Sequence, residues 1–130
     1  SSVTTHGNPH CHIILRGGSE GPNYDSGSVA AAIARLEESG VSKAIMVDAS
    51  HANSNKDHRL QPEVFENVID QRVKGNGWIV AGMLESNLEA GAQSLSGPLE
   101  TLTYGKSITD KCIDWETTER VVKAAYEKLS

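Results

Sequence analysis

The sequence predicts an α/β fold in which parallel strands are covered by outer helices, and three observations support this class. Apolar runs of strand length alternate along the chain with segments whose apolar residues recur at helical spacing. The runs are nearly continuous, which is typical of strands that are buried on both faces. With 130 residues, 38% of them hydrophobic, the chain has the size and composition of one globular domain.

The first two units each consist of a predicted strand, a loop and a helix. The run "CHIILRG" predicts a strand from Cys11 to Gly17, and the loop "GGSEGPNYDSGS" separates it from a helix. The run "SKAIMVDASH" predicts the second strand, and Pro62 suits the first turn of the helix that follows. The apolar faces of the two helices comprise Val29, Ala32, Ile33 and Leu36, then Phe65, Val68, Ile69 and Val73.

The third unit has a longer connection. The run "WIVAGMLESN" predicts a strand, and "LEAGAQSLSGPLETLTYGKSI" predicts a long loop that contains a short strand or a turn. Asp114 has the character of an N-cap, and the helix after it carries Val121, Ala125 and Leu129 on one face.

Polar residues end the successive strands at a regular interval. Arg16, His51 and Glu85 are spaced 35 and 34 residues apart, close to the roughly 30 residues per unit of an eight-fold β/α barrel. Such barrels assemble their active sites at the C-terminal ends of the strands, so we expect these residues and Asp110 to project from one rim. Side-chain alternation predicts a shared, inward face for each strand: Ile45, Val47 and Ala49 beneath His51, and Ile79, Ala81 and Met83 beneath Glu85.

Each of these residues also has an ordinary structural explanation. A single histidine at a strand end more often makes a structural hydrogen bond, and carboxylates at element ends usually cap helices or lie in water. Together, however, His51, Glu85 and Asp110 would form an N/O site suited to Mn²⁺, Fe²⁺, Co²⁺ or Zn²⁺. Arg16 would add a planar fork for a carboxylate or a phosphate.

The composition indicates which kinds of partner and which cellular compartment to expect. There are 12 basic and 17 acidic residues, a net charge of -5, and no basic cluster, so we expect no nucleic-acid partner. We see no apolar run of about 20 residues and no leader, so we expect no membrane association. Cys11 and Cys112 lie too far apart in sequence to suggest a zinc knuckle or a disulfide framework, and we expect a cytoplasmic protein. The sequence does not begin with methionine, and we expect it to be part of a longer chain.

Four blocks closely resemble the last third of class I 3-deoxy-D-arabino-heptulosonate 7-phosphate (DAHP) synthases, the first enzyme of the shikimate pathway. These blocks are "GNPHCHIILRGG", "VDASHANSNKDHRLQP", "GMLESNLEAGAQ" and "YGKSITDKCIDWETTE", and the resemblance extends over essentially the whole chain. It implies a single partial domain, residues 1–130, comprising the last three or so βα units of a TIM (β/α)8 barrel and incomplete on its own.

The resemblance also implies chemistry and roles. The family condenses phosphoenolpyruvate with erythrose 4-phosphate on a divalent metal and releases phosphate, a step in aromatic amino acid biosynthesis. The metal ligands would be His51, Glu85 and Asp110. Arg16 would bind phosphoenolpyruvate and, with His51, count as catalytic, and Asp110 would also contact substrate.

Some family features lie outside these residues. The family's cysteine ligand and its lysine-proline-arginine-threonine loop have no counterpart here, and we expect neither Cys11, assigned to the core, nor Cys112 to replace that ligand. Cys112 is either an inert buried thiol or a group near the site, and Lys106 is either a solvated loop residue or an aid to phosphate binding.

Two alternatives to an active synthase remain at this point. The chain could be a catalytically inactive partial barrel that only folds or assembles, because three or four strands cannot close an eight-stranded barrel. It could also be an unrelated metal-dependent aldolase on the same barrel. We expect the 130-residue chain alone to be inactive and to associate with the remainder of a barrel or with itself.

Overall fold

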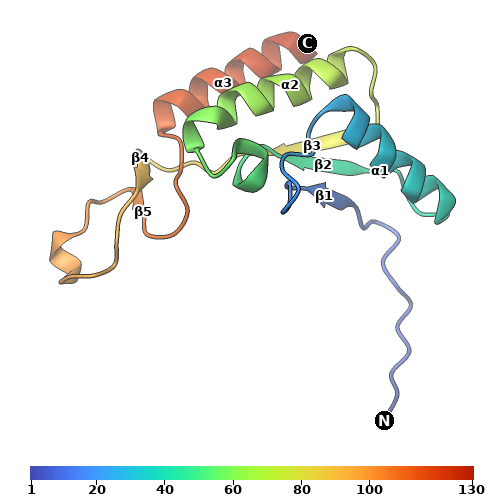
Figure 1. Cartoon of the computed structure of the whole chain (residues 1–130), viewed down its shortest axis with the longest axis horizontal. Helices are drawn as coiled ribbons and strands as arrows, with labels where there is room; N and C mark the ends of the chain where they lie inside the picture. The colour runs from blue at the N-terminus through green and yellow to red at the C-terminus, as the bar shows by residue number, and fades with distance from the viewer.

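Three consecutive strand–helix units form the main body of the protein. The computed structural model describes residues 1–130, and its strands and helices follow the predicted order (Figure 1). These elements are β1 (Ile13–Leu15), α1 (Ser26–Glu38), β2 (Ile45–Asp48), α2 (Gln61–Val73), β3 (Ile79–Met83), β4 (Glu89–Ala92), β5 (Lys106–Ser107) and α3 (Trp115–Leu129). Short 3-10 helices span His51–Ser54, His58–Leu60 and Leu99–Thr101.

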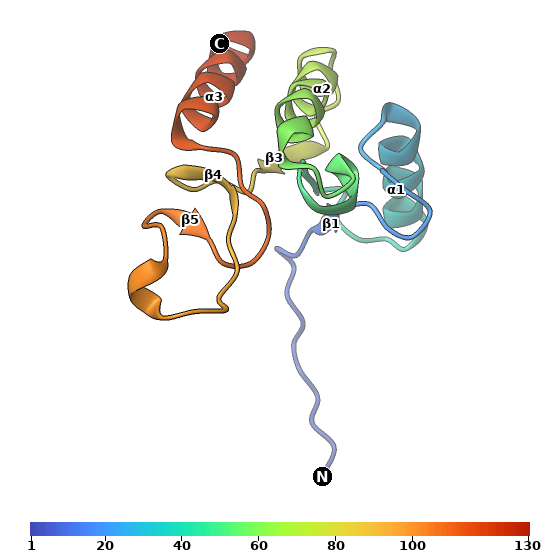
Figure 2. The ribbon, with the colours of Figure 1, turned by 60° about the vertical axis from the view of Figure 1, so that its left-hand side comes forward.

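The central sheet is parallel, as the sequence predicts. Its strand order is β1-β2-β3, and the register pairs Ile13 with Ile45 and Ile45 with Ile79. The register then shifts, so that Met46 pairs with Ala81 and Val80 is the extra residue of a bulge. The helices α1 and α2 lie over one face of the sheet, with α3 beside α2, and no helix covers the other face (Figures 1 and 2).

The helices α2 and α3 begin where Pro62 and Asp114 predict, and α1 begins at a cap that was not predicted. The Asp25 side chain caps α1 by accepting from the backbone amides of Gly27 and Ser28. Pro62 lies in the first turn of α2, where its missing amide donor costs nothing. Asp114 caps α3, because its Oδ1 accepts from the amide of Thr117 at 2.8 Å.

The core lies between the sheet and the helices, and it corrects one prediction. We expected Ile45, Val47 and Ala49 to face the barrel interior beneath His51. Instead, Ile45 and Val47 are fully buried with Val29 of α1 and Val68 of α2, on the helix-covered face. Alternation does not extend to His51, because β2 ends at Asp48 and His51 opens a 3-10 helix with a positive φ of 50°.

The opposite face of the sheet is open and apolar. Ile14, Met46 and Ala81 lie on it, since they alternate with core residues or pair with each other in register. Ile14 is 50% exposed. Met83 pairs with Asp48 on this same face, so Ala81 and Met83 share a face as predicted, whereas the bulge returns Ile79 to the core.

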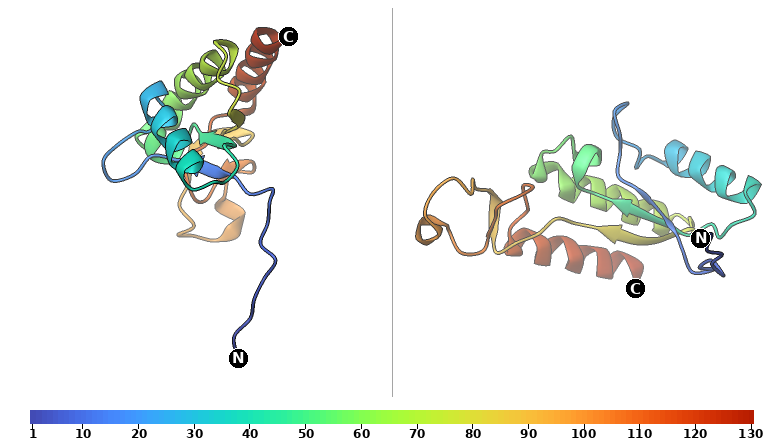
Figure 3. Two further views of the ribbon diagram at one scale, coloured as in Figure 1. Left: turned by 90° about the vertical axis from the view of Figure 1, so that its right-hand side faces the viewer. Right: turned by 90° about the horizontal axis from the view of Figure 1, so that it is seen from below.

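The long connection between β3 and α3 contains the short strand that the sequence predicts. It forms the parallel pair β4–β5, which lies beyond the C-terminal ends of the main strands (Figure 3). The chain then returns to β3: the amide of Ile113 donates to the Glu85 carbonyl at 2.9 Å, and the amides of Gly91 and Cys112 donate to each other's carbonyls. No helix is both long and apolar enough to span a membrane.

One glycine after β1 is required by its surroundings. Gly17 has a φ of +73°, and a Cβ added to it would lie 2.7 Å from the Ala52 Cβ, whereas Gly18 has open space. We expect Gly17→Ala to lower the free energy of unfolding by about 1–3 kcal/mol, because it adds both backbone strain and a clash. The matched control Gly18→Ala should stay within about 0.5 kcal/mol. Urea unfolding measures both, and equal midpoints for the two variants would contradict this account.

Candidate metal centre

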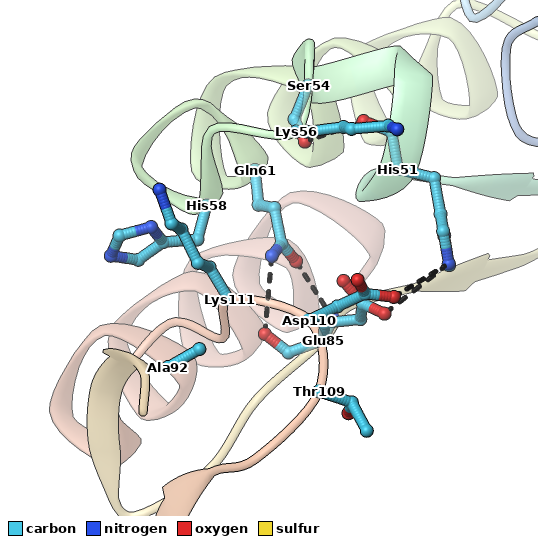
Figure 4. Close-up of a pocket in the computed structure, with 10 residues that line it drawn as sticks. All are labelled: His51, Ser54, Lys56, His58, Gln61, Glu85, Ala92, Thr109, Asp110 and Lys111. Carbon is cyan, nitrogen blue, oxygen red and sulfur yellow. Dashed lines mark hydrogen bonds and ion pairs between the residues drawn. The ribbon is translucent and has the colours of Figure 1, made fainter. Parts of the chain in front are cut away.

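The side chains of His51, Glu85 and Asp110 converge beyond the C-terminal ends of the strands. Nε2 of His51 lies 3.4 Å from Oε1 of Glu85 and 3.8 Å from Oδ2 of Asp110. One ligand atom from each residue falls within 4.8 Å of the others (Figure 4). His51 opens the 3-10 helix after β2, Glu85 follows β3 by two residues, and Asp110 lies between β5 and α3. The rim predicted from strand spacing therefore brings these three residues together.

A buried carboxylate holds the His51 ring. Oδ2 of Asp48, a residue only 1% exposed, lies 2.6 Å from Nδ1 of His51. Oδ1 of Asp48 accepts from both the amide and the hydroxyl of Ser50, at 2.7 and 2.6 Å. These contacts occur where the His51 backbone adopts its left-handed conformation, which is uncommon but tolerated better by histidine than by most residues.

Glu85 is fixed through its backbone by Gln61, the first residue of α2. The Glu85 amide donates to Oε1 of Gln61 at 2.8 Å, and Nε2 of Gln61 donates to the Glu85 carbonyl at 3.3 Å (Figure 4). Gln61 is 1% exposed, so both contacts are shielded from water. The side chain of Glu85 thus leaves from a backbone segment that is held between α2 and Ile113.

The site concentrates negative charge. Burial raises the pKa of the Glu85 carboxyl, the charges of Asp110 and Asp48 raise it further, and the nearby His51 opposes the shift. Three carboxylates therefore surround one imidazole in a partly buried position. A divalent cation would relieve this repulsion, because it neutralises charge that solvent reaches only in part.

A cavity of about 350 Å³ opens over these residues. Its lining is His51, Ser54, Lys56, His58, Gln61, Glu85, Ala92, Thr109, Asp110 and Lys111. Lys56 and Lys111 place positive charge beside the triad of His51, Glu85 and Asp110, and neither lysine was singled out from the sequence. The lining includes neither Lys106 nor Cys112. Burial raises the pKa of the Cys112 thiol, which donates to the Asp110 carbonyl at 3.6 Å.

Arg16 lies just after β1, the strand that neighbours β2, and it does not line this cavity. It follows β1 by one residue and its side chain is exposed. The loop that carries it is tied to the His51 loop by Asn53, whose Nδ2 donates to the carbonyls of Leu15 and Asp48. Asn53 Oδ1 also accepts from the amide of Asn23, and Oδ1 of Asn23 accepts from the amide of Gly17.

Sequence analysis did not identify three supporting residues, Asp48, Asn53 and Gln61. All are buried and polar, and all lie in or next to the stretch "VDASHANSNKDHRLQ". Two features of the sequence could have pointed to these residues. One is an aspartate at the end of an apolar strand, and the other is the presence of asparagine and glutamine side chains in the segment that also contains His51. A buried polar side chain needs hydrogen-bond partners. For Asn53 and Gln61 these partners include backbone groups at or just after the ends of the strands.

The fold and the site define a class, an α/β protein whose parallel strand ends carry a candidate divalent-metal site. The chain belongs to the DAHP synthetase I family, which it matches over residues 1–123. It is 46% identical over 128 residues to the Tyr-sensitive phospho-2-dehydro-3-deoxyheptonate aldolase of Salmonella typhimurium. It is 43% identical over 131 residues to the phenylalanine-inhibited enzyme of that name from Saccharomyces cerevisiae.

A solved structure gives the same assignment. The phospho-2-dehydro-3-deoxyheptonate aldolase of Francisella tularensis superposes with a TM-score of 0.89 and 40% identity, over 95% of this chain and 36% of that one. The matches to the Salmonella and yeast relatives cover 98% and 96% of this chain. The chain spans about a third of the length of these relatives, 36% and 35% respectively.

The raised pKa of Glu85 gives a prediction about stability in the absence of metal. A carboxyl whose pKa is higher in the folded chain stabilises the fold at pH below its unfolded value, and this contribution is lost as pH rises through the folded value. Glu85→Gln should therefore gain stability relative to the unaltered chain as pH rises from about 4 to about 7. Urea unfolding with a chelator present measures this, and the exposed Glu100→Gln is the control. Parallel pH profiles for Glu85→Gln and the unaltered chain would contradict it.

Proposed function

We propose that this chain supplies the metal-binding part of a 3-deoxy-7-phosphoheptulonate (DAHP) synthase. The reaction is the condensation of phosphoenolpyruvate with D-erythrose 4-phosphate, which gives DAHP and phosphate at the start of the shikimate pathway. The observation that carries the proposal is the convergence of His51, Glu85 and Asp110 at the strand ends of a chain that belongs to the DAHP synthetase I family. We place the reaction in the cytoplasm.

The donor set fits a divalent first-row metal. One imidazole nitrogen and two carboxylates suit Mn²⁺, Fe²⁺, Co²⁺ or Zn²⁺, and none of these ions requires a sulfur ligand. His51, Glu85 and Asp110 would hold the ion. When bound, it would polarise the aldehyde oxygen of the sugar phosphate, so that the enol carbon can attack without a strong acid.

The chain's own residues would hold two phosphorylated substrates close together. Arg16 offers a planar fork at the end of β1, which suits a carboxylate or phosphate of phosphoenolpyruvate. Lys56 and Lys111 line the cavity beside the triad and would offset the substrates' negative charge. The hydrogen bonds of Asn53 to Leu15 and Asp48 hold the Arg16 loop and the His51 loop at a fixed separation. A fixed separation would let the two substrates be oriented toward each other for reaction.

We also propose that further strands cover the open face of the sheet, either from the remainder of a (β/α)8 barrel or from a second copy. The outer edges of β1 and β3 are unpaired, and the face with Ile14, Met46 and Ala81 is apolar. Unpaired strand edges next to an uncovered apolar face favour association.

The metal proposal is tested in an assembled enzyme, made by joining this chain to the part of the Salmonella typhimurium relative that it does not match. His51→Ala, Glu85→Ala and Asp110→Ala should each reduce bound Mn²⁺ and lower turnover by more than about 100-fold, because each removes a ligand. Metal analysis and product formation measure this. His12→Ala and Glu100→Ala are matched controls that should change neither. Full activity with unchanged metal content in any ligand variant would remove that residue from the site.

The role of Arg16 is tested in the same assembled enzyme. Arg16→Lys keeps the charge but loses the two-pronged geometry, so KM for phosphoenolpyruvate should rise about tenfold, or ~1.4 kcal/mol, and KM for the sugar phosphate should rise much less. Arg35→Lys, on an exposed part of α1, serves as the control. Equal increases for both substrates would instead point to a general structural role.

The 130-residue chain on its own should self-associate at micromolar concentration and show negligible turnover with Mn²⁺ present. The reason is the uncovered apolar face and the open cavity, which leaves both substrates in water. Sedimentation and a product assay measure the two properties. A stable monomer with substantial turnover would contradict this prediction.

A further inference from the structure

Asp48 is the most deeply buried carboxylate at the strand ends, and it lies outside the triad. It ends β2 on the open face of the sheet and is 1% exposed. A carboxylate in such a position carries the desolvation penalty of a buried ion unless hydrogen bonds compensate. Ser50 supplies two of these bonds to Oδ1, and Nδ1 of His51 supplies the third to Oδ2.

These bonds fix which ring nitrogen of His51 carries the proton. Oδ2 of Asp48 can only accept, so Nδ1 of His51 must donate at 2.6 Å. In the neutral ring, Nε2 then carries a lone pair, and it is Nε2 that faces Glu85 and Asp110. The other tautomer would present an N–H at this position and could not bind a cation there.

The contact also fixes the direction of the ring. Nδ1 is held by a residue three positions earlier, across a backbone that turns through a positive φ at His51. The Ser50 hydroxyl, which Asp48 orients, also lies 2.8 Å from Nδ1 of His51. Without Asp48 the ring would keep at most this neutral contact, and the strained turn would lose the charge-assisted bond that offsets its cost. Asp48 thus restricts both the tautomer and the orientation of His51.

We propose that Asp48 is a positioning residue, which holds the His51 ring with Nδ1 protonated so that Nε2 binds the divalent ion. This inference rests on the proposed metal site and adds a residue that does not itself touch the ion. Supporting groups of this kind typically change metal affinity by 10–100-fold.

Asp48→Asn tests the proposal because its amide has only one acceptor. The fixed amide of Ser50 requires that acceptor, so the NH₂ group would face Nδ1 of His51 and favour the tautomer with its proton on Nε2. Affinity for Mn²⁺ alone, measured by electron paramagnetic resonance on the assembled enzyme, should fall about 10–100-fold with the circular dichroism spectrum unchanged.

Asp57→Asn is the matched control. Like Asp48, Asp57 accepts from a backbone amide two residues on, in this case that of Arg59, and it caps the second 3-10 helix of the same connection. It makes no hydrogen bond or ion pair with His51, Glu85 or Asp110. Its replacement should leave Mn²⁺ affinity unchanged. Equal affinity for Mn²⁺ in Asp48→Asn and the unaltered protein would overturn the proposal, and failure of the unaltered protein to bind Mn²⁺ would instead overturn the metal site itself.

A second measurement needs no Asp48 variant. Nitrogen-15 spectra of the Zn²⁺-loaded protein, with the His51 signals assigned by comparison with His51→Gln, should show zinc on Nε2 and a hydrogen-bonded proton on Nδ1. Zinc on Nδ1, or an Nδ1 without a proton, would overturn the role of Asp48 even if Asp48→Asn fails to fold.

Discussion

Buried side-chain amides satisfy the backbone groups at the ends of the strands, and the geometry of the site depends on them. Asn53 joins the last carbonyls of β1 and β2, and Gln61 takes both the amide and the carbonyl of Glu85. A parallel strand end has backbone groups that its neighbours no longer pair, and inside the protein each one left unpaired would cost about 1–3 kcal/mol. Loops that begin at fixed strand ends can carry functional side chains with fixed positions.

The cluster of carboxylates at the strand ends has an electrostatic cost. Asp48, Glu85 and Asp110 surround His51, and the partial burial of Glu85 prevents solvent from screening the charges fully. Such a cluster does not favour folding, so its presence is better explained by what it binds. The apolar residues that stabilise the units, including Val29, lie on the far side of the sheet, away from this charge.

Much of the fold was predictable because local patterns determine it. Helical spacing gave the three helices, and Pro62 and Asp114 marked where two of them begin. The spacing of strand ends brought His51, Glu85 and Asp110 together, because parallel strands deliver their C-terminal ends to one edge. Asp110 was predicted on this edge from its place after the long loop, but the return of that loop to the end of β3 depends on non-local hydrogen bonds that the sequence does not show.

What the sequence did not reveal depends on backbone conformation and burial. Alternation failed at His51 because the strand ends at Asp48 and the chain enters a 3-10 helix at a residue of positive φ. The bulge at Val80 changed the face of Ile79 for a similar reason. Asp48, Asn53 and Gln61 were missed because no local pattern distinguishes a buried polar residue at or between element ends from a solvated one.

The three side chains proposed as metal ligands differ in how far solvent reaches them, and this difference bears on how an ion would enter and leave. His51 and Glu85 each have 23% of their side chains exposed, whereas the Asp110 side chain is 70% exposed. In the proposed metal site, two donors would therefore lie partly buried and the third would lie in water. Water competes most readily for an ion at its most exposed donor, so such a site would be open to exchange with the surroundings. The ion bound in a cell would then follow the local supply of metals rather than the order in which they were loaded.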